Sequence, residues 1–234
     1  MEREIKEKAI CLKNSDSGEF DRFIWLFSIE RGVFKAKIRG VKKPKAKLSF
    51  ASFPLCLGEY LLVKTGNNYT VTNCNYIDNF AGLTSDLNLY YAGLGVLDVD
   101  SKVVKENQIA SNIFVATIKT LSALCYDKVN IFAVLVKFCF EVLASIGLGV
   151  SFDVDIDKTK NIYFDFYAGR FSNYASEDSA KISVNDFENL QEIWGRDIEN
   201  FEDVISSKNM FRMILSYFEF KTEEEFSVFQ MFSK

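Results

Sequence analysis

Apolar and polar residues alternate with a period of two through the first third of the chain. Five runs have this strand character, and breaks rich in Gly and Asn separate them. We predict strands over residues 5–12, 22–29, 33–41, 60–64 (with a start as early as 55) and 69–77. Five short strands within about eighty residues are typical of a small Greek-key barrel of the oligonucleotide-binding (OB) type. An SH3-like barrel fits nearly as well on pattern alone.

The hydrophobic period becomes helical from residue 83. We predict helices over residues 86–97, 108–125, 127–146, 184–194, 207–220 and 223–232. Thr84 or Ser85 is expected to cap the first helix, and Ser183 with Asp186 resembles a capping box. Residues 161–172 break the pattern and read as a short β-hairpin. The fold class is therefore α+β, with a five-stranded OB-fold barrel in residues 1–80 and a mostly α-helical domain with a hairpin insertion in residues 81–234.

Charge is distributed unevenly between these two parts. The 234-residue chain has a net charge of −4. Residues 1–80 contain 14 Lys/Arg and 9 Asp/Glu, which gives +5, whereas residues 81–234 contain 14 and 23, which gives −9. Such polarity indicates two surfaces with different functions.

A dense basic segment covers residues 35–47, where seven of thirteen residues are Lys or Arg and none is acidic. Gly40 and Pro44 favour a loop in its middle, and the alternation of residues 34–38 places Lys35, Lys37 and Arg39 on one face. Clustered cations neutralise phosphates, so we predict a nucleic-acid-binding surface here. A solvated basic loop without a ligand is the alternative. The expected binding residues are Arg22, Lys35, Lys37, Arg39, Lys42, Lys43, Lys45 and Lys47.

Aromatic residues flank the basic segment and could stack on bases. Phe50 and Phe53 follow it and are equally compatible with base stacking and with a place in the barrel core. Phe34 precedes it, and for that residue the core is the better interpretation.

Several kinds of chemistry lack their usual residues. The chain has no histidine, its five cysteines are scattered singly, and no phosphate-binding glycine loop occurs. We therefore expect no enzyme activity, no cofactor and no metal. The most apolar stretch, residues 131–150, is interrupted by Lys137 and Glu141, so we expect a buried helix rather than a membrane span. Without a recognisable export signal, a cytoplasmic protein is expected.

Four segments together resemble a known family. They read K-A-I-C-L-K at 8–13, G-E-F-D-R at 18–22, L-F-S-I-E-R-G at 26–32 and I-R-G-V-K-K-P-K at 38–45. Their order, spacing and residue types resemble the RecO family of bacterial recombination mediators, as does F-P-L-C-L-G-E-Y at 53–60. The resemblance is specific over about residues 8–65 and continues mostly as pattern towards the C-terminus.

The resemblance implies an OB-fold barrel and a non-enzymatic function in DNA repair. Members of that family bind single- and double-stranded DNA, anneal complementary strands and partner RecR. They also contact the C-terminal tail of the single-strand binding protein and help to load RecA, which makes RecA an indirect partner. The implied location is the bacterial cytoplasm, with nucleoid association during repair. By position, Arg22, Arg39 and the lysines at 42, 43, 45 and 47 would contact DNA.

One feature of that family is missing. Many members carry a four-cysteine zinc site in the region corresponding to about residues 147–173, but this stretch contains neither Cys nor His. We therefore predict a degenerate hairpin region without zinc. Packing of Phe164, Phe166 and Phe171 is expected to replace the metal structurally.

Two other functions remain open from the residues alone. An RNA-binding barrel protein, such as a ribosome-associated factor, would show the same barrel and basic loop. A protein-interaction scaffold could use the loop to bind an acidic tail. A hydrolase is the least compatible class, because neither histidine nor a nucleophile motif is present.

Overall fold

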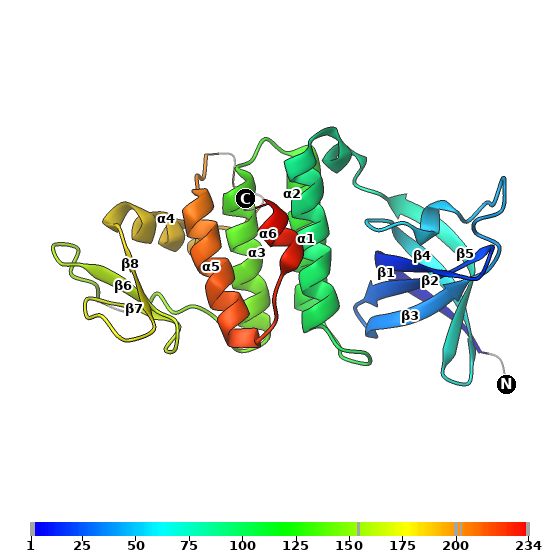
Figure 1. Ribbon diagram of the computed structural model, residues 1–234, viewed down its shortest axis with the longest axis horizontal. Coiled ribbons are helices and arrows are strands. Elements are labelled where there is room, and N and C mark those ends of the chain that lie inside the picture. Colours follow the sequence, from blue (N-terminus) through cyan, green and yellow to red (C-terminus); the bar gives the residue numbers. More distant parts are fainter. Residues whose placement is uncertain (1–2, 154, 199–200, 202, 233–234) are drawn as a thin grey trace. The chain divides into compact units, whose positions relative to one another are not determined.

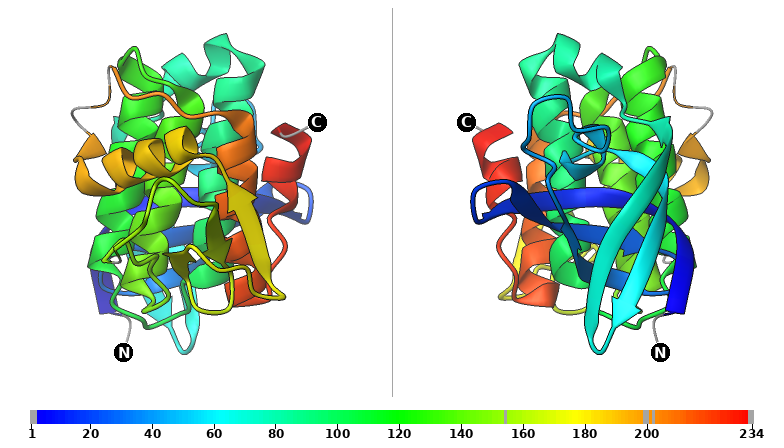
Figure 2. Two further views of the ribbon diagram at one scale, coloured as in Figure 1. Left: turned by 90° about the vertical axis from the view of Figure 1, so that its left-hand side faces the viewer. Right: turned by 90° about the vertical axis from the view of Figure 1, so that its right-hand side faces the viewer.

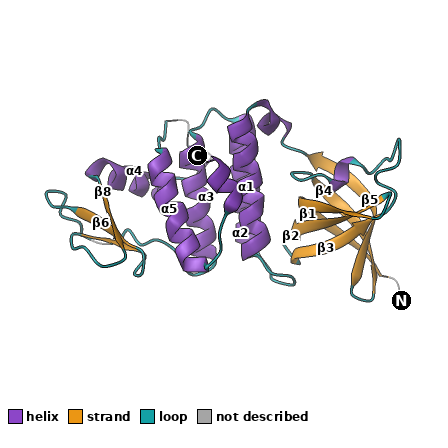
Figure 3. Ribbon diagram, viewed as in Figure 1, coloured by secondary structure: helices purple, strands orange, loops and turns teal. Residues whose placement is uncertain are grey.

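The computed structural model describes residues 3–153, 155–198, 201 and 203–232, and the chain divides into two compact units, residues 1–114 and residues 115–234. Figure 3 shows the strands of one barrel in the first unit, whereas the second unit is largely helical with one small sheet. The α+β class predicted from the change of hydrophobic period is confirmed.

Five strands close into a barrel in the first unit (Figure 1). The strands are β1 (Arg3–Ser17), β2 (Asp21–Ser28), β3 (Gly32–Ile38), β4 (Leu57–Thr65) and β5 (Asn68–Asp78). They follow the order β1-β2-β3-β5-β4, in which β3 and β5 are parallel and the other pairs are antiparallel. This is the OB-fold barrel that the alternation predicts.

Strand β1 is longer than predicted because it serves two neighbours. Its first part pairs with β4 and its second part with β2, and the register shifts between Cys11 and Lys13. Such an irregularity bends a strand and lets a sheet close on itself. Apolar side chains from all five strands fill the interior, together with three residues from the β3–β4 connection: Val41, Ala51 and Cys56.

A helical segment follows the barrel within the first unit. A 3₁₀ turn covers Ala81–Ser85, and α1 extends over Leu87–Val103. Asp86 caps α1 by accepting hydrogen bonds from the backbone N–H groups of Asn88 and Leu89. The predicted caps Thr84 and Ser85 are wrong, because both lie inside the 3₁₀ turn and their hydroxyls bond to its carbonyls.

The connection after α1 is fixed to the turn between β2 and β3. The N–H of Asn107 donates to the carbonyl of Arg31 over 2.8 Å, and the N–H of Ala110 donates to that of Ile29. Gly32 has a positive φ of 62°, and a Cβ at this position would overlap the carbonyl oxygen of Lys105. The sequence therefore needs glycine in this turn, both for its conformation and for the close approach.

Five further α-helices follow within the described ranges: α2 (Ser111–Tyr126), which begins in the first unit, α3 (Ile131–Ser145), α4 (Val184–Gly195), α5 (Lys208–Thr222) and α6 (Ser227–Phe232). In the second unit α3 and α5 lie side by side (Figure 1). Ser183 caps α4 through the N–H of Asp186, as predicted. Glu223 does not begin a helix as predicted: it adopts a left-handed conformation that ends α5.

The hairpin of the second unit has a third strand that the sequence pattern did not indicate. Strands β6 (Ile162–Asp165) and β7 (Arg170–Ser172) form the expected hairpin, and β8 (Ser179–Ile182) pairs with the other edge of β6. Four residues without clear alternation, Ser-Ala-Lys-Ile, are too short a signal for a strand.

Helix α3 contains the most apolar part of the chain. Its Lys137 is buried, and the ammonium donates to the carbonyl oxygen of Trp194 over 3.1 Å while lying 3.7 Å from Glu141. Across the described ranges, no helix combines the length and apolar character needed to cross a membrane.

Candidate nucleic-acid interface

Lysines and aromatic rings share the outer face of strands β1, β2 and β3. Because side chains alternate along a strand, Phe23 and Trp25 point outwards while Ile24 and Leu26 fill the core. The register pairs Trp25 with Lys13 on one side and Lys35 on the other, and pairs Phe23 with Lys37. We call the residues Lys13, Phe23, Trp25, Lys35 and Lys37 the cation–aromatic face.

The ammonium groups of this face lie over its rings. Lys35 Nζ is 3.9 Å from the centroid of Phe23 and 5.2 Å from that of Trp25. Lys13 Nζ lies 5.4 Å from Trp25, and Lys37 Nζ lies 5.8 Å from Phe23. Both rings are half-buried, so each retains surface exposed to solvent. Cations near aromatic faces are attracted by the ring quadrupole, which keeps these lysines close to the barrel surface.

A groove of about 690 Å³ adjoins this face. One side is formed by Phe23, Lys35, Lys37 and Arg39, and the other by polar residues of the β4–β5 turn and the start of β5. The polar wall consists of Thr65, Asn67, Asn68 and Thr70. Glu106, from the connection after α1, contributes the one acidic side chain among the described residues that line this groove. Positive charge, a ring and amide groups therefore meet in one concave surface.

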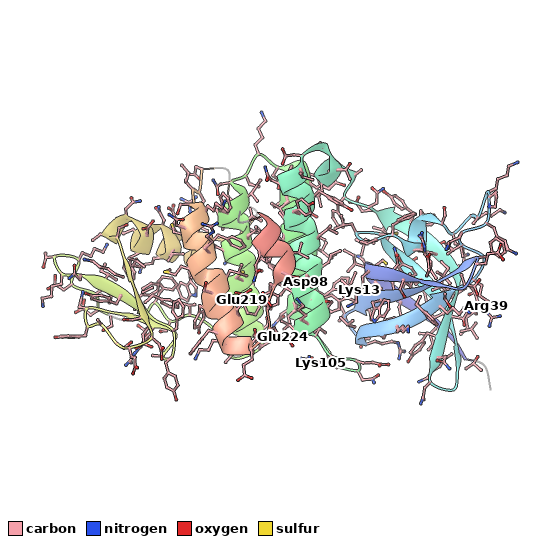
Figure 4. All side chains as sticks on the ribbon, in the orientation of Figure 1. Lys13, Arg39, Asp98, Lys105, Glu219 and Glu224 are labelled. Atoms are coloured by element: carbon pink, nitrogen blue, oxygen red, sulfur yellow. The ribbon has the colours of Figure 1, made fainter. Side chains whose placement is uncertain are left out.

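Asp21 restrains the cations at one end of the groove. Its carboxylate is 2.9 Å from Lys37 Nζ and accepts the backbone N–H of Gly40 over 2.8 Å. The Gly40 bond, followed by the lysine, lowers the pKa of Asp21 below its ordinary value. Arg39 is exposed at this end, and Figure 4 shows it at the end of the barrel farther from α1.

The basic loop, residues 40–47, is an ordered chain of turns. The N–H of Lys43 bonds to the carbonyl of Gly40, and the N–H of Ala46 bonds to that of Lys43. Val41 is buried in the barrel core and anchors the start of the loop. Gly40 and Lys45 have positive φ angles, so the segment does not continue as a strand. The sequence predicted a loop over these residues. Burial of Val41 in the barrel core fixes the start of that loop on the barrel.

The lysines of the basic loop differ in their freedom. Lys42 Nζ is 2.7 Å from the Asp16 carboxylate, and this bond is the main cause of a lowered pKa for Asp16. Lys43, Lys45 and Lys47 are exposed, and within the described part of the chain no carboxylate lies within ion-pair distance of them. These three ammonium groups are therefore the ones available for an anionic ligand.

Arg22 lies among protein groups. Its guanidinium donates to Ser52 Oγ over 3.0 Å, lies 3.5 Å from Asp16 and stacks 4.9 Å from the centroid of Phe53. These contacts join β2 to the short 3₁₀ turn Phe50–Ser52. Arg22 therefore has a structural task in addition to any contact with a ligand.

The structure separates the two aromatic candidates that follow the basic loop. Phe50 packs against the barrel core, and its ring is 6.0 Å from that of Tyr76. Phe53 is 50% exposed beside Arg22. Phe34 is buried in the core, as expected. Of these three rings, Phe53 alone offers a half-exposed face.

The predicted cationic residues occupy two places on the barrel. Lys35, Lys37 and Arg39 line the groove, whereas the basic loop follows β3 at another end of the barrel. Both views in which the barrel is clear, Figure 1 and the right panel of Figure 2, show the loop above the strands and the β4–β5 turn below them. Phe23, Trp25 and Lys13 were missed by sequence reasoning. The alternation in F-I-W-L-F at 23–27 was the available signal.

The second unit does not offer a zinc-binding set where the family resemblance would place one. Residues 147–173 lack Cys and His, and no group of three or more metal-binding side chains occurs in the described ranges. Rings occupy the hairpin instead. Phe171 contacts Phe152, Phe164 and Phe187 with centroid distances of 4.7, 5.0 and 5.0 Å. Carbon-rich side chains of this kind cannot coordinate zinc.

Comparisons with known proteins agree with this description. The sequence model described as "Recombination protein O N terminal" matches residues 1–80, and that described as "Recombination protein O C terminal" matches residues 84–227. The "DNA repair protein RecO" of Clostridium novyi (strain NT) is 27% identical over 97% of this chain and 87% of its own length. The protein of the same name from Clostridium kluyveri is 24% identical over 88% of this chain and 82% of its own length. The chain therefore belongs to the RecO family of DNA repair proteins.

Proposed function

We propose that this protein is a non-enzymatic recombination mediator. It binds single- and double-stranded DNA through the barrel, anneals complementary strands and acts with RecR to load RecA onto DNA covered by the single-strand binding protein. The tail of that binding protein is an expected partner. The observation that carries the proposal is the set of free ammonium groups at Lys43, Lys45 and Lys47, on a chain whose net charge is −4.

Electrostatics supports DNA as the ligand of the basic loop. Each phosphate neutralised by a lysine releases counterions, so affinity falls as salt rises. Family membership supports a DNA substrate, and annealing needs no nucleophile or ATP site. Among the described residues, the free thiols of Cys11, Cys56, Cys74 and Cys139 are buried. Burial raises the pKa of Cys11 and Cys139, which keeps them as unreactive thiols at neutral pH.

The test is charge reversal in the basic loop. The Lys43→Glu, Lys45→Glu, Lys47→Glu triple variant leaves the Lys42–Asp16 ion pair intact, so its fold should be preserved. We expect it to lose binding to both single strands and duplexes, measured by fluorescence anisotropy. Annealing of complementary oligonucleotides, followed by energy transfer between dyes, should be lost with it. Unchanged affinity would remove the loop from the interface.

A second triple variant controls for net charge. Lys128, Lys160 and Lys181 are exposed on the second unit, and their replacement by Glu changes the total charge equally. We expect nearly unchanged DNA binding from this control. If both triple variants weaken binding alike, bulk charge rather than the loop governs affinity. Addition of RecR and single-strand binding protein to the annealing assay then tests the proposed partners, and matched RNA competitors test the preference for DNA.

A further inference from the structure

We propose that Cys56 and Cys74 form an oxidation-sensitive thiol pair inside the barrel, which hydrogen peroxide converts into a disulfide. Formation of the disulfide requires no nucleic acid and can be measured on the protein alone. Its consequence, a lower affinity of the basic loop for DNA in the oxidised protein, rests on the proposed function. The pair therefore makes the barrel a reversible sensor of peroxide.

Three cysteine side chains meet inside the barrel. Cys11, Cys56 and Cys74 belong to the core cluster of the first unit, and they come from β1, the β3–β4 connection and β5. The thiol of Cys74 donates a hydrogen bond to the sulfur of Cys56, and this bond is the main cause of a lowered pKa for Cys56. The thiolate is the form of cysteine that attacks an oxidant. Cys56 is therefore the nucleophile of the pair, and Cys74 is the thiol in contact with it.

Cys11 lies in the same core but is held apart from this chemistry. Its thiol donates to the carbonyl oxygen of Lys13, which lies 3.7 Å from the sulfur. Burial raises the pKa of Cys11 above its ordinary value, so little thiolate is present at neutral pH. Cys11 therefore serves as an internal control for the pair.

The glycine at position 58 leaves room for the thiol of Cys74. A Cβ at Gly58 would lie 2.6 Å from the sulfur of Cys74, which is closer than van der Waals contact permits. The sulfur thus occupies the space of a missing side chain on β4, two residues along the chain from Cys56. Any larger residue at position 58 would compete with the thiol for this space.

A pocket gives a small oxidant access to Cys56. The pocket has a volume of about 340 Å³, and Phe53, Pro54 and Tyr76 line it together with Cys56. Phe53 and Tyr76 are 50% and 54% exposed, so the pocket reaches the surface of the barrel. One water molecule occupies about 30 Å³ in the liquid, so a peroxide with two oxygen atoms fits easily. Cys56 itself is 2% exposed, which excludes a bulky oxidant.

The oxidation proceeds in two balanced steps. The Cys56 thiolate attacks one oxygen of hydrogen peroxide, so that an S–O bond forms and the O–O bond breaks. The hydroxide that leaves takes up the proton that Cys56 released and becomes water. The sulfur of Cys74 then attacks the sulfenic acid at Cys56, the S–S bond forms and the S–O bond breaks. The second hydroxide leaves with the proton of Cys74 as water, so two thiols are oxidised and both peroxide oxygens are reduced.

Formation of the disulfide must move Cys56. The two sulfur atoms have to approach to about 2.05 Å. Cys74 lies within β5 opposite Tyr60 of β4, whereas Cys56 precedes β4 and is the freer end. The carbonyl of Cys56 accepts the N–H of Cys11 over 2.9 Å and the hydroxyl of Tyr60 over 3.3 Å. We expect both bonds to be disturbed in the oxidised protein.

The β3–β4 connection joins this movement to the basic loop. The connection begins after β3, contains the basic loop and ends at Cys56. The hydroxyl of Tyr60 also binds the carbonyl of Ala51 over 3.0 Å, so the disturbed bonds include one anchor of the 3₁₀ turn that follows the loop. A loosened loop must be ordered again when DNA binds. The cost of ordering one side chain corresponds to a loss of about 2- to 12-fold in affinity.

Peptide mapping tests the pair directly. The full-length protein carries Cys125→Ser, because Cys125 is half-buried on the second unit and can form disulfides between molecules. After treatment with hydrogen peroxide, the remaining thiols are blocked with iodoacetamide in denaturant and the protein is digested with trypsin. We expect a linked pair of peptides, residues 48–64 and 65–102, which contain Cys56 and Cys74. The peptide of residues 9–13, with Cys11, should be recovered alkylated.

Single variants separate the roles of the thiols. Cys74→Ala should abolish the linked peptides and leave a sulfenic acid at Cys56, which dimedone traps. Cys56→Ala should abolish both products. Cys11→Ala removes a thiol from the same core and is the matched control, so the linked peptides should persist. Circular dichroism checks that each variant is folded, and the map without these core substitutions remains decisive if one of them is not.

The outcomes separate the pair from the proposed function. The expected result is linked peptides together with a loss of about 2- to 12-fold in affinity for oligo(dT), which dithiothreitol restores. Unoxidised thiols, a sulfinic acid at Cys56 without linked peptides, or a link to Cys11 would overturn the pair. Linked peptides with unchanged affinity would overturn the connection to the basic loop. If the reduced protein binds no oligonucleotide at low salt, the proposed function fails, whereas linked peptides still support the pair.

Discussion

The ammonium group of Lys35 lies over the ring of Phe23, 3.9 Å from its centroid, although the residue directly opposite Lys35 in the sheet is Trp25. The lysine thus leans diagonally and caps the ring face that a base would need. A cation–π contact at an exposed site contributes about 0.5–1 kcal/mol, and a stacked base contributes about 1–3 kcal/mol. We therefore expect that a base stacked on Phe23 would displace the ammonium, which would then be free to bind a phosphate.

Replacement of Lys35 by Gln should change the salt dependence of the affinity for oligo(dT). The variant loses one phosphate contact, so the slope of log K against log salt should become shallower by about 0.7 for single strands. Between 50 and 200 mM salt, the ratio of wild-type to variant affinity should then fall by about 2.6-fold. Anisotropy titrations with oligo(dT) measure both slopes. Lys128→Gln on the second unit is the control, and an unchanged slope for Lys35→Gln would exclude Lys35 from the phosphate path.

Asp21→Asn should strengthen single-strand binding. The wild-type carboxylate holds Lys37 at 2.9 Å, and a partly exposed surface ion pair of this kind contributes about 0.2–1 kcal/mol. Release of the lysine should therefore tighten oligo(dT) binding by about 1.5- to 5-fold at low salt. The Asn oxygen can still accept the N–H of Gly40, so the loop should keep its path. Asp153→Asn, an exposed change of equal charge, should have little effect.

The same carboxylates predict how stability responds to acid. The pKa values of Asp16 and Asp21 are lowered in the fold, chiefly by the Lys42 side chain for Asp16 and by the Gly40 N–H for Asp21. A group with a lowered folded pKa stabilises the protein above its ordinary pKa, about 3.9 for Asp, and this contribution is lost as pH falls through the lowered value. Thermal unfolding from pH 7 to pH 2 should show this acid limb. The loss of stability between pH 7 and pH 2 should be smaller in the Asp16→Asn, Asp21→Asn double variant. An equal loss in the variant and the wild type would contradict the assignment.

Much of the barrel could be predicted from the sequence because side-chain alternation is a local signal. Lys35 and Lys37 were placed on one outer face by that signal alone. The rings of Phe23 and Trp25 were not recognised as their partners, because the pairing depends on the register between β2 and β3. Register is set by the β2–β3 turn and by packing of the whole barrel rather than by any one strand.

Loop residues were the least predictable part of the site. Phe50 and Phe53 have the same sequence environment, yet one packs on the core and the other is half exposed. The difference in exposure between Phe50 and Phe53 follows from the 3₁₀ turn Phe50–Ser52, which places Ala51 in the barrel core. No local periodicity of the sequence predicts that turn. The predicted N-cap of α1 was wrong for a similar reason. Thr84, Ser85 and Asp86 are all residues that can cap a helix. Thr84 and Ser85 lie inside the 3₁₀ turn, so the helix begins after Asp86.

The aromatic cluster of the second unit should carry stability without metal. Phe171 is 1% exposed and contacts three rings, so Phe171→Ala should destabilise the second unit by about 3–5 kcal/mol. Phe220→Ala, at a 45% exposed ring, should cost much less. Denaturant unfolding followed by circular dichroism measures both. Incubation with a chelator should leave the melting temperature of the wild type unchanged, and a marked decrease would reveal a metal that the residues of the hairpin do not suggest.

Glu106→Gln should tighten binding of single strands and leave duplex binding unchanged. Glu106 is exposed at the groove that Lys35, Lys37 and Arg39 line, where its charge opposes that of a phosphate. At a separation of about 8 Å in water, removal of one unit charge changes the binding energy by about 0.5 kcal/mol, or about twofold in affinity. The gain should be visible at 20 mM salt and much smaller at 200 mM, where screening acts over shorter distances. Glu177→Gln, an exposed site on the second unit, gives the matched control. A gain for duplex DNA as large as that for oligo(dT) would mean that the groove does not discriminate between them, because only a ligand inside the groove should sense this carboxylate.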